Sequence, residues 1–125
     1  MAFDRPTADQ MIRDVGAEAF CRLATYFVEE TGHEIEAIEA LAVQSPKGAT
    51  LKELGRRGHS LKNAAGSFGL AEIAQAARAL EAAGDSSNGR EAVRLALSLR
   101  VVCESSLPKL RAFIEETKAR SGLQG

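Results

Sequence analysis

The side chain best suited to chemistry in this sequence is His59, which opens the stretch H-S-L-K-N-A-A-G-S-F-G that ends at Gly69. Imidazole is partly neutral at cellular pH, so one ring nitrogen can attack an electrophile while a hydrogen bond holds the other. If His59 attacks a phosphoryl group, Lys62 one helical turn later can offset the negative charge that the ring gains. A general acid or base would need a pocket and a second catalytic group, and this stretch provides neither.

The residues around His59 predict a helix that presents this histidine to solvent. Apolar and small residues recur at steps of three and four, which predicts one buried stripe. That stripe consists of Leu51, Leu54, Gly58, Leu61, Ala65 and Phe68. His59 lies off it, on a polar face. The predicted partner contacts on this face are Lys52, Gly55, Arg56, Asn63 and Gly66.

Charge and side-chain size on this face suggest how a partner would use it. A basic helix face is often only solvated surface, but with His59 at its centre this one favours docking of an acidic protein. We expect transfer to be faster at low salt for that reason. Gly55 and Gly66 are expected to leave room for close approach.

The motif H-S-L-K-N-A-A-G-S-F-G-L, followed by I-A-Q-A-A-R-A-L-E, resembles the signature of the histidine phosphotransfer (HPt) domain family from about His59 to Glu81. The resemblance implies that His59 accepts a phosphoryl group from one receiver-domain aspartate and relays it to another. It also implies that Lys62 is the charge partner of the phosphate and that Gly69 is the turn glycine. Glu81 falls where the family usually has Glu or Gln beside the imidazole.

Two positions depart from the family pattern. Asn63 stands where a glycine usually follows the lysine, and Ala77 stands where a cysteine is common. We expect Asn63 to crowd or hydrogen-bond the docking partner, which would affect the choice of partner more than activity.

Counting along the chain places Glu81 near the imidazole. His59 lies ten residues before Gly69 and Glu81 twelve after it. In a tight helical hairpin these positions differ in height by only about 3 Å. We therefore predict that Glu81 reaches His59, and that Arg78, another predicted partner contact, lies near Lys62.

The resemblance also implies the partners and cofactors. The partners would be response-regulator receiver domains and a receiver-bearing hybrid histidine kinase, with Mg²⁺ bound by the receiver. This chain would need no metal or nucleotide, and it lacks a glycine-rich phosphate loop, so we expect a phosphohistidine intermediate without ATP-dependent kinase activity. Free-standing members of the family suggest a monomer. No nucleic acid or membrane partner is expected from a net charge of −1 and the absence of a long apolar run.

Two other classes of function are considered. A helical-bundle adaptor would dock receivers through the same face without phosphotransfer. A metal or haem bundle would need Glu-x-x-His pairs or several axial ligands, whereas the two histidines lie on different predicted helices. His33, the second histidine, is expected to be a surface residue.

Composition favours an all-α fold. The 125 residues, 45% of them hydrophobic, suggest a single domain over 1–125, with residues 1–6 and 121–125 loosely ordered. Helices are predicted over 7–15, 17–43, 51–68, 70–84 and from about 89, with Thr7 and Thr50 as N-caps. The prediction is an antiparallel up-down four-helix bundle with a short N-terminal lid helix.

Three further expectations concern local features. Gly32 is expected to leave the second helix whole, while Pro108 should kink or restart the last one. Cys21 and Cys103 are expected to be reduced core thiols. The absence of a signal-peptide pattern favours a cytoplasmic protein.

Overall fold

The computed structural model describes residues 3–123, and within this range the chain is helical without any strand. It is all-α, as the composition predicted. The helices are α1 (Arg5–Val15), α2 (Ala17–Ala42), α3 (Ala49–Ser67), α4 (Ala71–Asp85) and α5 (Gly89–Ser121).

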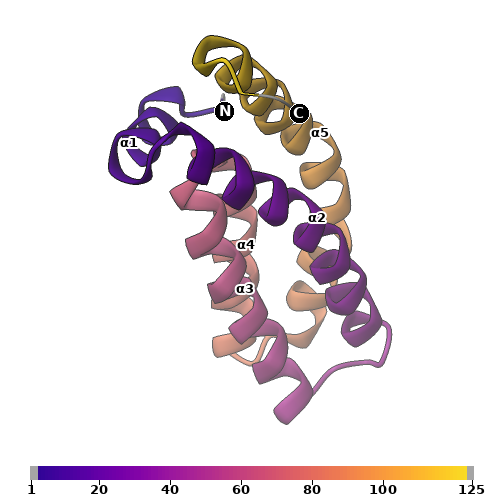
Figure 1. Ribbon diagram of the computed structural model, residues 1–125. Coiled ribbons are helices and arrows are strands. Elements are labelled where there is room, and N and C mark those ends of the chain that lie inside the picture. Colours follow the sequence, from indigo (N-terminus) through magenta and orange to yellow (C-terminus); the bar gives the residue numbers. More distant parts are fainter. Residues whose placement is uncertain (1–2, 124–125) are drawn as a thin grey trace.

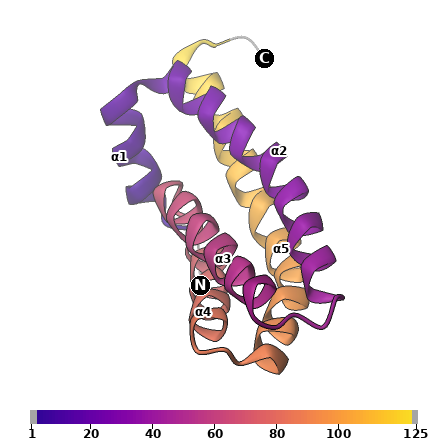
Figure 2. The same cartoon turned by 90° about the horizontal axis from the view of Figure 1, so that it is seen from below.

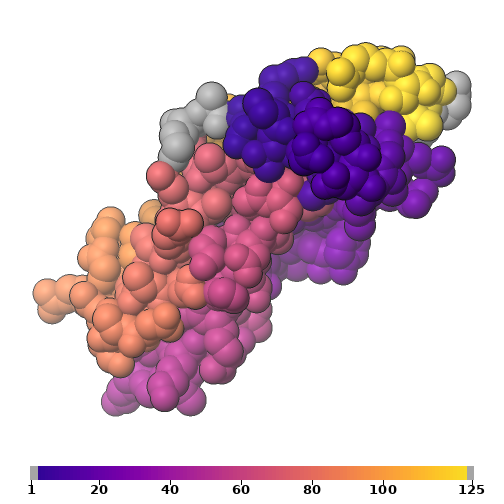
Figure 3. Space-filling view, turned by 90° about the vertical axis from the view of Figure 1, so that its left-hand side faces the viewer, coloured from indigo at the N-terminus to yellow at the C-terminus, as the bar shows by residue number. Residues whose placement is uncertain are grey.

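The helices form two closely packed pairs with α1 at one end. α3 and α4 are joined by a tight turn and lie side by side, and the two longest helices, α2 and α5, also run along each other (Figure 1, Figure 2). α4 also packs against α5, which joins the pairs, and α1 contacts the beginning of α2 and the end of α3. In space-filling view the α3–α4 hairpin forms a continuous face beside α1 (Figure 3).

A cluster of aromatic rings fixes the end of the protein at which α1 lies. Phe20 of α2 contacts Phe68 after α3 and Phe113 of α5 edge-on, with ring centroids 6.0 and 5.7 Å apart. Each such pair contributes about 0.5–1.5 kcal/mol beyond the area it buries. Since the cluster unites three helices, it anchors the C-terminal end of α3, the helix that carries His59.

Glycines allow α3 and α4 to approach each other closely. A Cβ atom on Gly58 would lie 2.8 Å from the Ala77 carbonyl oxygen and 2.9 Å from the Glu81 nitrogen. A Cβ on Gly84 would lie 2.7 Å from the Gly55 Cα. No side chain fits at such distances, so the two backbones pack directly on each other.

This close approach shows that the predicted role of Gly55 is wrong. The helical wheel assigned Gly55 to the open face, but the structure buries it against α4. Gly55 lies at the border between the apolar stripe and the polar face, and a closely packed neighbour covers this border. Its missing side chain therefore serves helix packing rather than partner access.

The chain before α1 folds onto the α3–α4 turn. Gly69 has a φ of +79°, as expected for the glycine that ends the helix. Its carbonyl accepts a hydrogen bond from the Asp4 amide at 2.8 Å, and a Cβ on Gly69 would lie 2.3 Å from the Asp4 carbonyl oxygen. Glycine is thus required at this position by both conformation and space.

The beginning of α1 differs from the prediction. Asp4, and not Thr7, is the N-cap, and its carboxylate accepts from the Thr7 amide at 3.3 Å. Phe3 packs against the Phe113 ring, and Arg5 forms an ion pair with Glu116 of α5 at 2.7 Å. The predicted loose segment is therefore folded from Phe3 onward, while residues 1–2 lie outside the described range.

The two longest helices are continuous. α2 passes through Gly32 without a break, as predicted. α5 also passes through Pro108 as one helix, so of the two alternatives predicted there the restart is wrong and the kink stays a prediction. Asn88 caps α5 by accepting a hydrogen bond from the Glu91 amide at 3.2 Å.

Two helix ends are longer than expected. α3 begins at Ala49 after Gly48, so Thr50 lies in the first turn instead of capping it. α5 continues to Ser121 and ends at the left-handed Gly122, so the predicted loose end is helical in part, and residues 124–125 are not described. None of the helices in the described range is long and apolar enough to cross a membrane.

Candidate functional site

His59 lies near the middle of α3 and projects from its exposed side. Its side chain is 54% exposed, as the helical pattern predicted. The preceding residue, Gly58, is buried against α4. The imidazole therefore lies at the edge of the α3–α4 contact, where it is open to solvent but within reach of side chains from α4.

Glu81 of α4 joins the imidazole to Lys62. Its Oε2 lies 2.7 Å from His59 Nδ1, and its Oε1 lies 2.9 Å from Lys62 Nζ. The predicted contact between Glu81 and His59 is therefore confirmed. Glu81 and Lys62 are only 21% and 23% exposed, so the ring is held by a carboxylate that is itself largely shielded from water.

These contacts set the protonation of the site. The hydrogen bond from Lys62, followed by that from His59, lowers the pKa of Glu81, although its partial desolvation opposes the shift. Glu81 is thus ionised at neutral pH and can only accept hydrogen bonds. The facing Nδ1 must carry a proton, which assigns the neutral ring to the Nδ1–H tautomer with its lone pair on Nε2.

Asn63 contacts that second ring nitrogen. Its Nδ2 lies 3.2 Å from His59 Nε2. The sequence predicted that Asn63 would meet the docking partner, and its contact with the acceptor histidine was missed. The spacing of four residues on one helix was the available signal, because such residues are neighbours on the helix surface.

Most of the other predicted partner contacts are exposed. Lys52, Arg56 and Gly66 lie on the solvent side of α3, and a Cβ on Gly66 would meet nothing within 4 Å. Arg78 is exposed on α4, three residues before Glu81. That Arg78 lies near Lys62 remains a prediction.

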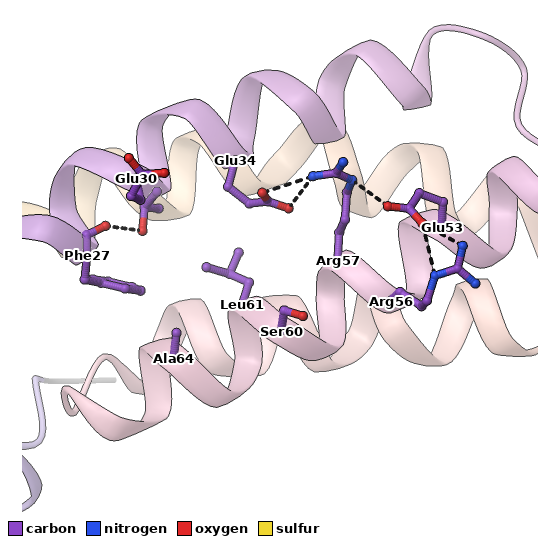
Figure 4. A pocket seen from close by; sticks show the side chains of 10 residues that line it. Phe27, Glu30, Glu34, Glu53, Arg56, Arg57, Ser60, Leu61 and Ala64 are labelled. Carbon is purple, nitrogen blue, oxygen red and sulfur yellow. Dashed lines mark hydrogen bonds and ion pairs between the residues drawn. The ribbon is translucent and has the colours of Figure 1, made fainter.

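A groove between α2 and α3 borders this face and contains a chain of paired charges. Its volume is about 440 Å³. Arg57 Nη1 lies 3.0 Å from Glu34 of α2, and Arg57 Nε lies 3.1 Å from Glu53, which also binds Arg56 at 2.6 Å (Figure 4). The lining residues are Phe27, Glu30, Thr31, Glu34, Glu53, Arg56, Arg57, Ser60, Leu61 and Ala64.

These ion pairs reduce the basic character predicted for α3. Between positions 47 and 68 the sequence contains five lysines and arginines and one acidic residue, Glu53. In the structure Glu34 and Glu81, from neighbouring helices, also compensate positive charges of this stretch. The face around His59 is thus less basic than its local sequence.

Other reactive side chains do not join this site. Cys21 and Cys103 are buried and not in a disulfide, and burial raises the pKa of both thiols, that of Cys103 to about 11. His33 is exposed on α2. Within residues 3–123, no three His, Cys, Asp or Glu side chains gather in a group able to hold a metal ion.

The fold and site together define an all-helical protein with an exposed histidine held by a carboxylate from the next helix. The profile described as Hpt domain matches residues 22–119, from α2 to α5 and well over half of the chain. This chain therefore belongs to the Hpt domain family, whose members perform histidine phosphotransfer in two-component signalling and interact with receiver domains. Neither the curated proteins nor the solved structures contain a significant match.

Proposed function

We propose that this protein accepts a phosphoryl group on His59 from a receiver-domain aspartate and relays it to another receiver in a two-component phosphorelay. The observation that carries the proposal is the exposed imidazole whose Nδ1 faces the ionised Glu81 carboxylate at 2.7 Å. This arrangement leaves Nε2 as the nucleophile. The family match supports the same chemistry.

In the proposed step, the Nε2 lone pair attacks the phosphorus of the aspartyl phosphate. A P–N bond forms, the bond from phosphorus to the aspartate oxygen breaks, and the receiver regains its carboxylate. The ring keeps its Nδ1 proton and gains positive charge, which Glu81 stabilises across the hydrogen bond. Lys62 keeps Glu81 ionised, and its ammonium offsets part of the charge of the phosphoryl group. Transfer to the next receiver reverses these steps.

The receiver is proposed to dock over the exposed side of α3 and the adjoining part of α4. Lys52, Arg56, Asn63, Gly66 and Arg78 are exposed there and are the proposed contacts. Relay proteins exchange partners, so the interface is expected to be small, below about 1,200 Å². We assign Mg²⁺ to the receiver and no cofactor to this chain. A hybrid histidine kinase is the proposed upstream partner.

The finer architecture and setting belong to the same proposal. The arrangement of α2 to α5 supports an antiparallel up-down four-helix bundle, with α1 as the lid. We further propose that the protein acts as a cytoplasmic monomer, because transient docking over one exposed face requires no second copy.

Phosphoryl transfer from isolated receivers tests the proposal. Receiver domains carrying labelled phosphate on their aspartate would be incubated with the wild-type protein and with His59→Ala. We expect acid-labile, base-stable label on the wild type and none on the variant, since phosphohistidine has that stability. Label that persists on His59→Ala, or a folded wild type that accepts phosphate from none of the receivers, would overturn the proposal.

The adaptor remains the second candidate, and the Asn63 contact on Nε2 is the observation that favours it. With both nitrogens of the imidazole engaged, no lone pair is free to attack phosphorus, while the face around the ring could still dock a receiver. If the protein is an adaptor, the wild type and His59→Gln should bind receivers equally well, and neither should be labelled. A relay protein would be labelled only as wild type.

A further inference from the structure

The side chain of Asn63 covers the nitrogen on which phosphate would be carried. Its Nδ2 lies 3.2 Å from His59 Nε2, while Glu81 occupies Nδ1 at 2.7 Å. Because Nδ1 must donate to the carboxylate, Nε2 of the neutral ring presents a lone pair. An amide N–H can only donate, so the contact is a hydrogen bond from Asn63 to that lone pair.

We propose that Asn63 is a positioning residue that restrains the acceptor nitrogen and thereby slows phosphoryl acceptance. This inference rests on the function proposed above. Attack on phosphorus needs the same lone pair that accepts the hydrogen bond from Asn63. The amide must therefore move away from Nε2 before a P–N bond can form.

The surroundings of Asn63 allow this movement. The Asn63 side chain is exposed. Among the described residues, its amide nitrogen is held by the hydrogen bond to His59. The Ser67 hydroxyl binds the Asn63 backbone carbonyl and leaves the amide untouched. A Cβ on Gly66, one turn later, would meet nothing within 4 Å, so this position leaves space beside Asn63. The restraint is thus one hydrogen bond on a side chain with room to rotate.

A docking receiver can release the restraint by competing for the amide. A carbonyl or carboxylate oxygen that accepts from Asn63 Nδ2 would turn the side chain away from the ring. Receivers with such an oxygen beside their phosphoaspartate would then react faster than those without it. Asn63 would in this way influence which receivers exchange phosphate with His59.

Phosphoramidate, a small phosphoryl donor that needs no docking, provides the direct test. The variants are Asn63→Ala and Asn63→Leu, of which the second keeps the bulk of the side chain and loses the donor. Ser60→Ala, a similar change at an exposed position next to His59, is the matched control. Both Asn63 variants should accept phosphate roughly 2- to 12-fold faster than wild type, the range expected for release of one hydrogen bond. Ser60→Ala should react at the wild-type rate.

Nitrogen NMR of the imidazole gives a second readout that does not depend on phosphotransfer. The Nε2 signal of His59 should move in both Asn63 variants, and remain in place in Ser60→Ala. An unmoved Nε2 signal, or equal or slower acceptance by both Asn63 variants, would overturn the inference. If the wild type accepts no phosphate from phosphoramidate or receivers while the Nε2 signal moves as expected, the restraint stands and the proposed phosphotransfer fails.

Discussion

Each of the two histidines of this protein follows a glycine in a helix, and both are exposed, but their surroundings differ. A Cβ on Gly32, before His33, would meet nothing within 4 Å, whereas one on Gly58, before His59, would collide with the backbone of α4. This close approach brings Glu81 to His59, while His33 faces solvent on α2. The helix that packs beside an exposed histidine thus determines whether its ring gains a carboxylate partner.

The largest difference between the two histidines should appear on their removal. His59→Gln is expected to abolish labelling by a phosphorylated receiver, because no other nitrogen can take the place of Nε2. His33→Gln should leave labelling unchanged. Both variants should keep the wild-type helical circular dichroism, since both side chains are exposed. Labelling that survives in His59→Gln, or is lost in His33→Gln, would contradict the comparison.

Alanine at the two preceding glycines should have opposite effects. Gly58→Ala places a methyl group 2.8 Å from the Ala77 carbonyl oxygen and should lower the free energy of unfolding by about 1–3 kcal/mol. The displaced Glu81 should also slow transfer, by up to about 100-fold if the shift reaches 1 Å. Gly32→Ala should raise the free energy of unfolding by up to about 1 kcal/mol at unchanged transfer. Urea denaturation and receiver labelling measure both effects, and equal responses of the two variants would refute the proposed role of Gly58.

Removal of charge from Glu81 should have a smaller effect. Glu81→Gln keeps an oxygen that can accept from Nδ1 but loses the carboxylate, so we expect acceptance to slow about tenfold. Glu36, three residues from His33 on α2, is the matched control position, and Glu36→Gln should behave as wild type. Rapid-quench labelling from one receiver measures the rates. An unchanged rate in Glu81→Gln would show that the charge of Glu81 is dispensable.

The lowered pKa of Glu81 also predicts a pH dependence of stability. A carboxylate whose pKa is lower in the folded state stabilises the protein fully above its ordinary value of 4.5. This contribution is lost as the pH falls from there through the folded pKa. The difference in unfolding free energy between wild type and Glu81→Gln should therefore shrink as the pH falls below about 4.5. Denaturation at several pH values in this range tests this, and a difference that grows as the pH falls below about 4.5 would contradict it.

Salt should have the smallest effect. Arg56 and Arg57 are paired with Glu53 and Glu34, so the face around His59 attracts an acidic receiver only weakly. Raising ionic strength from about 0.01 to 0.15 M should slow transfer from a receiver only a few-fold, and should leave acceptance from phosphoramidate nearly unchanged. A steep salt dependence would indicate that the ion pairs open when the receiver docks.

Much of the site was predictable from local rules. The apolar spacing of α3 and the turn at Gly69 were enough to predict that His59 is exposed and that Glu81 reaches it. The contact between Asn63 and the ring was also accessible from the spacing of four residues. It was missed because Asn63 stands where the family usually has glycine, and this difference suggested a contact with the partner instead.

Features that depend on neighbouring helices could not be read from α3 alone. Gly55 and Gly66 look equivalent on a helical wheel, but only α4 decides that the first is buried and the second open. Likewise, the partner of Arg57 on α2 lies 23 residues away. At the beginning of α1, Asp4 and Thr7 are both good capping residues, and the bond of the Asp4 amide to the turn explains why the helix starts there.

The bond between Asp4 and Gly69 reaches beyond the boundaries of the family match. Residues 3–16 lie outside positions 22–119, yet the Asp4 amide among them bonds the α3–α4 turn, from which the relative heights of His59 and Glu81 are counted. A fragment cut at the family boundaries would keep every side chain of the site and lose that brace. The His59 imidazole and the Glu81 carboxylate would remain on α3 and α4, but the position of one helix along the other would be less firmly fixed.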